Sequence, residues 1–215
     1  MAQKGDFLDH MKRSFADVPI DTANDNAIDT LAFLEASEEV LKLSSAFGSI
    51  VNGLVGSDIK KNIDGVREGC QRNPLHAATL QSLCAVDAKA QEKLMWLLRG
   101  LRFIYYALTL DVDDKANDSV PEDQQTLSKP FAESYDKVLS EHHFRITRMA
   151  ISKAISASLP TAKDFYGTLS SSRSMTETRQ ALKPWLEGLG HIVDIMYPLI
   201  DTSSPEFKAR AKAKK

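Results

Sequence analysis

The sequence predicts an all-α protein that folds as one domain. Apolar residues recur at spacings of three and four through most of the chain, and no segment shows the period of two that is typical of a strand. The 10 glycines and 8 prolines fall mostly between these periodic segments, where they favour helix ends. At 215 residues with 43% hydrophobic content, the chain can bury a sizeable core.

Six helices are predicted in order, with a short segment at 161–169 before the last of them. Asp29 or Thr30 can cap the first helix, and Gly48 follows its last residue, Phe47. Ser57 or Asp58 begins the second helix, and prolines or a serine cluster separate most of the later ones. The predicted helices cover residues 29–47, 57–73, 75–83, 87–110, 131–159 and 176–200.

Three segments are expected to lie outside the helical core of this single domain of residues 1–215. Residues 1–28 form an N-terminal extension, and the acidic, polar residues 111–130 predict a surface loop. Residues 207–215 carry five positive charges and no negative ones, so the rest of the chain is acidic. We expect this basic tail to be a mobile, solvated terminus, with contact to anionic lipid head groups as the alternative.

Composition and motifs exclude several classes of function. The acidic body lacks the basic footprint of a nucleic-acid binder, and no uncharged stretch is long enough to span a bilayer. Cys70 and Cys84 are too few for a disulfide framework and lack metal-ligand spacing. Phosphate-loop, dinucleotide, zinc-protease and nucleophile-elbow motifs are absent from the sequence. We therefore expect a cytosolic protein that is not an enzyme and uses neither a metal nor a cofactor.

The segment 93–103 carries an unusual helix face. Trp96, Arg99 and Arg102 follow at steps of three, so an indole plane and two guanidinium groups point roughly the same way. An aromatic plane beside fixed donors suits a polar, flat-faced ligand such as a sugar ring. The alternative is a buried tryptophan with two solvated arginines.

Two further pairs could contribute polar groups to a site. Asp58 and Asn62 lie four residues apart on one predicted helix face, and a carboxylate with an amide could hold neighbouring hydroxyls. Alternatively, Asp58 caps its helix. His142 and His143 are adjacent in the predicted helix 131–159, so their side chains diverge by about 100° and only one should face inward.

In this order the residues resemble the glycolipid transfer protein family, from about Phe33 to Tyr197. The resemblance is carried by Phe33-Leu-Glu-Ala36, Asp58-x-x-x-Asn62, Trp96-Leu-x-Arg-Gly-Leu-Arg-Phe103, and then Tyr135 and His143. Residues 13–19 look most like the fungal heterokaryon-incompatibility branch. The resemblance implies a two-layer helical sandwich that encloses one sphingolipid, with its chains in an apolar interior and its head group in a surface recess.

The resemblance also implies a role for each residue. Trp96 would stack on the first sugar, Asp58 would accept from a sugar hydroxyl and the ceramide amide N–H, and His143 would donate to the amide carbonyl. Asn62 would bond neighbouring sugar hydroxyls. Support would come from Arg99, Lys61 and Tyr135, and the apolar lining from Phe33, Val51, Val55, Phe103, Leu139 and Ile151, for each of which ordinary core packing is the alternative.

Two positions depart from the family pattern. Gly65 stands where the family usually has a lysine, three residues after the asparagine, and Lys60, Lys61 or Arg67 could compensate. Arg145 stands where some members carry a tryptophan that dips into the membrane. Membrane contact would then use Phe144, Tyr105, Tyr106 or the basic tail.

The implied function is transfer of neutral glycosylceramides between membranes, through transient contact with the membrane surface and with no predicted protein partner. A glycolipid sensor that reports to a partner protein is one alternative, and ceramide-1-phosphate transfer is another. In the phosphate-carrying branch an arginine replaces the tryptophan and a second arginine precedes it by one turn. This chain has Trp96 and Glu92 at those positions, and a carboxylate there would repel a phosphate.

Overall fold

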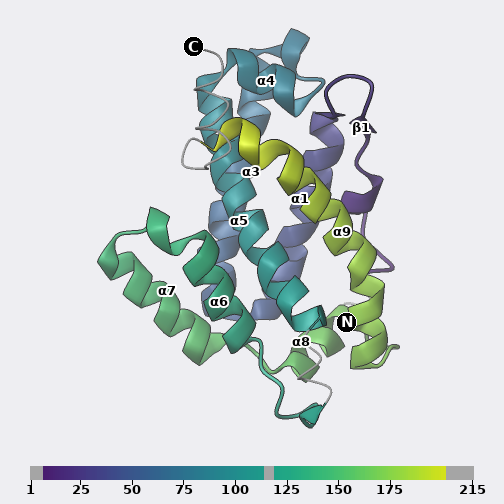
Figure 1. The fold of residues 1–215 in the computed structure, drawn as a ribbon, viewed down its shortest axis with the longest axis vertical. Helices are drawn as coiled ribbons and strands as arrows, with labels where there is room; N and C mark the ends of the chain where they lie inside the picture. The colour runs from purple at the N-terminus through teal and green to yellow at the C-terminus, as the bar shows by residue number, and fades with distance from the viewer. Residues whose placement is uncertain (1–6, 114–118, 202–215) are drawn as a thin grey trace.

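The computed structural model describes residues 7–113 and 119–201, which form helices and one short hairpin (Figure 1). The all-α prediction is confirmed. Within the described residues, short 3₁₀ turns lie between the longer elements at Phe15–Asp17, Ser45–Phe47, Pro74–His76 and Ser140–His142. The α-helices are α1 (Thr30–Ser44), α2 (Ser49–Val51), α3 (Ser57–Arg72), α4 (Leu80–Val86), α5 (Ala88–Asp113), α6 (Ser128–Val138), α7 (Arg145–Ser158), α8 (Ala162–Leu169) and α9 (Met175–Ile200).

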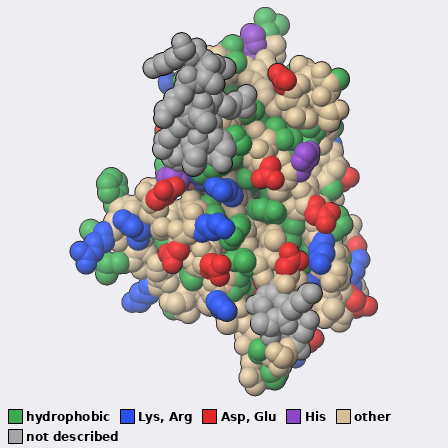
Figure 2. All heavy atoms as spheres, in the orientation of Figure 1, with side chains coloured by type: hydrophobic (Ala, Val, Ile, Leu, Met, Phe, Trp, Pro, Cys, Tyr) green, Lys and Arg blue, Asp and Glu red, His purple; other side chains and the backbone are tan. Residues whose placement is uncertain are grey.

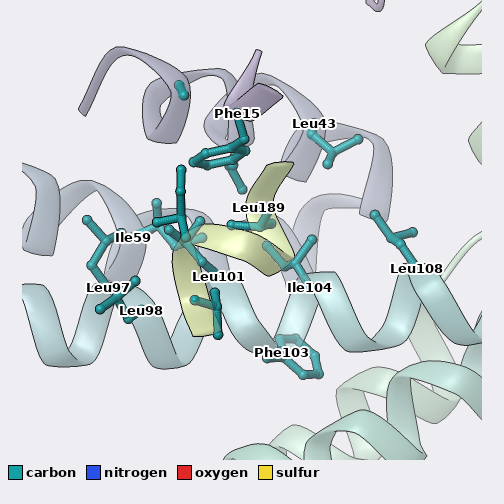
Figure 3. Close-up of a cluster of buried hydrophobic side chains, with 14 of the residues drawn as sticks. Phe15, Leu43, Ile59, Leu97, Leu98, Leu101, Phe103, Ile104, Leu108 and Leu189 are labelled. Atoms are coloured by element: carbon teal, nitrogen blue, oxygen red, sulfur yellow. The ribbon is translucent and has the colours of Figure 1, made fainter. Parts of the chain in front are cut away.

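Helix α5 lies at the centre of the fold and packs against α3, α6 and α9. Its apolar residues are fully buried on more than one side, as expected for a helix covered by several neighbours. Figure 3 shows Leu97, Leu101 and Ile104 of α5 beside Ile59 of α3 and Leu189 of α9. Every residue placed on α5 or α3 is therefore held by a rigid, packed element.

The described residues before α1, 7–28, pack against the core through Phe15. Phe15 is buried, and its ring lies 5.3 Å from Trp185 and 6.3 Å from Phe33. The backbone of Ala16 packs directly against Gly188 of α9. This approach requires glycine, because a Cβ at position 188 would lie only 2.4 Å from the Ala16 nitrogen. The hairpin of β1 (Ile20–Asp21) and β2 (Ala27–Ile28) follows, an element too short for strand periodicity to reveal.

The helix that carries Asp58 begins earlier than predicted. Residues 49–72 run continuously through α2, a π-helical turn at Asn52–Gly56, and α3. Gly56 keeps right-handed helical dihedrals, with no side-chain cap at the start of α3. Asp58 therefore does not cap a helix, and this alternative reading of it is wrong. Single π turns inside helices occur frequently at functional sites.

The predicted long helix 131–159 is broken in two. α6 ends at Val138, a 3₁₀ turn covers Ser140–His142, and α7 begins at Arg145. Between them His143 is extended, with φ −113° and ψ 142°. The sequence has no glycine or proline there to signal the break. The break between α6 and α7 allows α7 to project from the body of the molecule (Figure 1).

The predicted surface loop 111–130 is also only partly correct. α5 continues to Asp113, and Asp111 is buried, where it pairs with Arg179 of α9 at 3.1 Å and accepts from the Tyr166 hydroxyl at 2.6 Å. The chain therefore enters the loop later than its polar composition suggests.

The last helix keeps its predicted extent. α9 begins with a capping box between Ser174 and Glu177 and continues through Pro184 and Pro198. None of the described helices is long and apolar enough to cross a membrane. The predicted basic tail, 207–215, lies outside the described residues.

Candidate functional site

An apolar cavity of about 220 Å³ opens between the α2–α3 helix, α5, α6 and α7. Most of its wall is aliphatic or aromatic, and a few polar groups reach it from different elements. The lining residues are Val51, Leu54, Val55, Asp58, Ile59, Trp96, Gly100, Phe103, Tyr135, Leu139, His143, Ile151, Ala154 and Ile155.

Five of the six residues predicted as apolar lining lie on this wall: Val51, Val55, Phe103, Leu139 and Ile151. Phe33 does not. It is fully buried on α1 against Phe15, in the part of the core that also contains Trp185. Helical periodicity identifies a buried position but not the apolar compartment that it faces, and a contact of Phe33 with lipid chains stays a prediction.

Trp96 is half-buried on α5, and two side chains fix its ring. The Arg99 guanidinium lies 4.7 Å from the ring centroid, and His142 meets the ring edge-on at 6.2 Å and 83°. Arg99 is itself buried and forms two 2.8 Å hydrogen bonds to Asp201 at the end of α9. The expectation of two solvated arginines is thus wrong for Arg99, whose contacts support the indole.

Asp58 and Asn62 form a hydrogen-bonded pair on α3. The Asn62 amide donates to the Asp58 carboxylate at 3.1 Å. Asn62 is buried and is not among the cavity-lining residues, whereas Asp58 reaches both the cavity and solvent. Loss of hydration beside the apolar wall raises the pKa of Asp58, and the charges of Lys61, His143 and Lys93 oppose that rise.

His143 faces the same cavity from the break between α6 and α7. Its Nδ1 lies 3.0 Å from the Tyr135 hydroxyl. Burial lowers the pKa of His143 and raises the pKa of Tyr135, so at neutral pH the ring is neutral and the phenol keeps its proton. A phenol that donates to Nδ1 leaves the Nε2–H as the donor of the ring. In that tautomer the cavity offers an acceptor at Asp58 and a donor at His143.

One charged residue near the site escaped the sequence analysis. The aliphatic stem of Lys93 on α5 covers Gly65 on α3, so closely that a Cβ at Gly65 would lie 2.5 Å from the Lys93 Cγ. The sequence feature that could have identified Lys93 is its position three residues before Trp96, on the same helix face. Lys61, the predicted support, is exposed on α3 and acts on Asp58 through its charge.

Comparisons with known proteins agree on one family. The family model described as Glycolipid transfer protein (GLTP) matches residues 28–171. A glycolipid transfer protein of Aureobasidium melanogenum is 34% identical over 197 residues, 89% of this chain and 91% of the relative.

Solved structures with a similar fold also include a glycolipid transfer protein. The fungal glycolipid transfer protein HET-C2 matches with a TM-score of 0.79 and 33% identity, covering 93% of this chain and 98% of its own. Human ceramide-1-phosphate transfer protein shares the fold alone, with a TM-score of 0.73 at 19% identity over 91% of this chain and 95% of its own. The predicted helical sandwich of this type and the predicted fungal resemblance are both confirmed. The chain belongs to the glycolipid transfer protein family.

Proposed function

We propose that this protein binds one glycosphingolipid with a neutral sugar head group and carries it between membranes without changing it chemically. The observation that supports this most directly is the polar set at one apolar cavity: the Trp96 ring, the Asp58 carboxylate and the His143 imidazole. An aromatic face can stack on the apolar face of a sugar ring. An acceptor and a donor match the N–H and C=O of a ceramide amide, and the apolar wall can receive hydrocarbon chains.

Carrying a lipid through water requires shielding of its chains, since each exposed CH₂ costs about 0.8 kcal/mol. The cavity volume of about 220 Å³ is below the roughly 300–1,000 Å³ of ordinary small-ligand sites. The walls must therefore separate when a two-chain lipid enters. α7 is the wall best suited to move, because Ala154 and Ile155 are its only buried residues.

The Trp96 ring and the Asp58 carboxylate favour a neutral head group over a phosphate, whereas the cations Lys61 and Lys93 do not discriminate against a phosphate. Asp58 lies on the cavity wall, and Glu92 precedes Trp96 by four residues on α5. Two carboxylates near a phosphate would repel it in a partly desolvated site. Ceramide-1-phosphate transfer therefore has less support.

Sugar hydrolysis also has little support. Cleavage of a glycosidic bond ordinarily needs two carboxyl groups about 5–10 Å apart. Asp58 is the single carboxylate among the described cavity-lining residues. We therefore infer a carrier rather than an enzyme.

Sub-stoichiometric transfer tests the proposal and separates it from a lipid sensor. Protein at a concentration far below that of labelled galactosylceramide in donor vesicles is expected to move many lipids per molecule to acceptor vesicles. Depletion of only one lipid per protein would favour the sensor, and release of free galactose would indicate an enzyme.

Membrane contact is proposed for the start of α7. Phe144, Ile146 and Met149 are 89%, 84% and 65% exposed, and α7 continues into the cavity wall through Ile151. Arg145 and Arg148 are exposed beside them, with no ion-pair partner in the described parts of the chain. Figure 2 shows hydrophobic and basic side chains together on this projecting part. Such a surface suits an anionic bilayer.

The other groups expected to contact the membrane are less suitable. Tyr106 is engaged by Lys137, whose ammonium lies 4.0 Å from its ring centroid. Tyr105 packs against Gly190, where a Cβ would lie 2.8 Å from the tyrosine hydroxyl. Of the described residues that were predicted to contact the membrane, Phe144 is the one whose side chain is exposed and free to do so.

Phe144→Asp is expected to lower transfer between anionic vesicles by about tenfold or more, because burial of a phenylalanine side chain contributes about 1.5–3 kcal/mol. Vesicle flotation should show reduced binding, whereas binding of a short-chain, micelle-free glycolipid should be unchanged. The matched control is Leu75→Asp, since Leu75 is 93% exposed after α3 and away from the cavity. An equal loss in both variants would contradict the assignment of this surface.

We infer a cytosolic location. Cys70 and Cys84 are both free thiols, as is usual in reducing compartments.

A further inference from the structure

A lysine and a glycine meet where α3 and α5 pack beside the cavity. A Cβ at Gly65 would lie 2.5 Å from Cγ and 2.8 Å from Cδ of Lys93. Real side chains do not approach so closely, so Lys93 can hold this position only while residue 65 is glycine. Gly65 is buried in the middle of α3, where glycine is otherwise unfavourable. The pair therefore fixes the course of the lysine stem.

Lys93 lies on α5 about one turn before Trp96 and is not itself among the cavity-lining residues. Lys93 precedes Trp96 by three residues and Gly100 by seven, and both of these residues line the cavity. The charge of Lys93 lowers the pKa of Asp58, as the charge of Lys61 does. Lys93 and Lys61 therefore both favour the ionised form of the Asp58 carboxyl group.

The Lys93 ammonium group has N–H donors that no acceptor among the described residues engages. Lys93 is half-buried, and among the described residues no hydrogen bond or ion pair engages its Nζ. An ammonium group carries three N–H donors and no acceptor. Sugar hydroxyls above the Trp96 ring would supply the acceptors that the protein does not.

We propose that Lys93 is a head-group-binding residue that donates hydrogen bonds to hydroxyl oxygens of the sugar stacked on Trp96, and that Gly65 provides the space for it. This inference rests on the proposed function. Asp58 accepts hydrogen bonds from the ligand, and Lys93 donates to it from the neighbouring helix. The two residues together recognise hydroxyl groups, which act as both donors and acceptors.

The decisive variant is Lys93→Met, which keeps an unbranched stem over Gly65 and removes the ammonium group. Transfer of galactosylceramide between vesicles is expected to fall about tenfold, the size of the loss when one charged donor is removed. The glycolipid concentration for half-maximal rate should rise, and the melting temperature should stay unchanged. Lys93→Arg should retain most of the activity.

Lys89→Met is the matched control, since Lys89 is an exposed lysine one turn earlier on α5. It should transfer at the wild-type rate. If the wild-type protein transfers no glycolipid, the proposed function fails. If the wild-type protein transfers and Lys93→Met equals it, only the inference about Lys93 is overturned.

Gly65→Ala tests the glycine independently. Its Cβ must displace the lysine stem, so transfer should fall in the wild-type background, although alanine favours the helix. In a Lys93→Ala background the same substitution should cost much less, because only the Cβ of residue 93 remains, 3.2 Å from the added Cβ. An equal cost of Gly65→Ala in both backgrounds would contradict the proposed link between the two residues.

Discussion

Asp58→Asn is expected to lower glycosylceramide transfer by about tenfold or more, because a charged acceptor of hydrogen bonds contributes about 1.5–3 kcal/mol. Asparagine has the same shape and can still accept from the Asn62 amide, which donates to Asp58 at 3.1 Å. The substitution therefore removes the charge and leaves the helix intact. The measurement is vesicle-to-vesicle transfer of galactosylceramide.

The same variant should be at least as stable as the wild type. Burial raises the pKa of Asp58 above its ordinary value of 3.8, so the folded state holds this proton more tightly than the unfolded state does. Stability from this group is therefore present below pH 3.8 and is lost as pH rises through the raised pKa. At neutral pH the ionised Asp58 opposes folding, as expected for a residue retained for binding.

Asp64→Asn is the matched control on the same helix. Asp64 pairs with Lys60 at 2.6 Å, and its side chain is 48% exposed. It should change neither transfer nor stability appreciably, since exposed pairs contribute little. A clear loss of stability in Asp58→Asn would show that the carboxylate has a structural role, and unchanged transfer would remove Asp58 from the site.

Local signals in the sequence account for much of the fold. The Asp29 side chain caps α1 at the Ala32 N–H, as its residue type predicts. The serine cluster before α9 contains the Ser174 capping box. For these two helices the predicted start agrees with the structure to within a few residues, whereas α4 begins at Leu80, capped by Thr79, and not at the predicted Leu75.

Boundaries that depend on distant contacts could not be predicted in this way. The break before α7 is accompanied by contacts of His142 with Trp96 and of His143 with Tyr135, and a sequence pattern contains neither contact. The buried pair of Asp111 with Arg179 joins residues 68 positions apart. Composition alone therefore placed Asp111 in a loop.

The residues of the candidate site likewise fall into those that the sequence could predict and one that it could not. The order of Asp58, Trp96 and His143 along the chain indicated a family, and the structure brings all three to one cavity. Their roles toward a ligand stay predictions. Lys93 was missed because its significance lies in the space left by Gly65, 28 positions earlier on another helix.

Asp201→Ala is expected to lower the free energy of unfolding by about 3–5 kcal/mol, because it removes the carboxylate that accepts two hydrogen bonds from the buried Arg99 guanidinium. Both side chains are nearly inaccessible, at 6% for Arg99 and 0% for Asp201, and two 2.8 Å hydrogen bonds join them. Equilibrium denaturation in urea measures the loss. Because Arg99 also lies 4.7 Å from the Trp96 ring centroid, the Trp96 ring, which we propose as the sugar platform, should lose its support as well.

A double variant separates the two consequences of this ion pair. Arg99→Met with Asp201→Leu replaces both charges by apolar groups and should recover most of the lost stability, since a buried pair adds little over good apolar packing. Transfer should nevertheless stay below the wild-type rate, because methionine cannot provide the cation that Arg99 places against the indole. Full recovery of transfer would mean that the end of α9 stabilises the fold without positioning Trp96. Recovery of stability alone would identify the Arg99–Asp201 pair, whose carboxylate is 105 residues from Trp96 in sequence, as positioning the proposed head-group site.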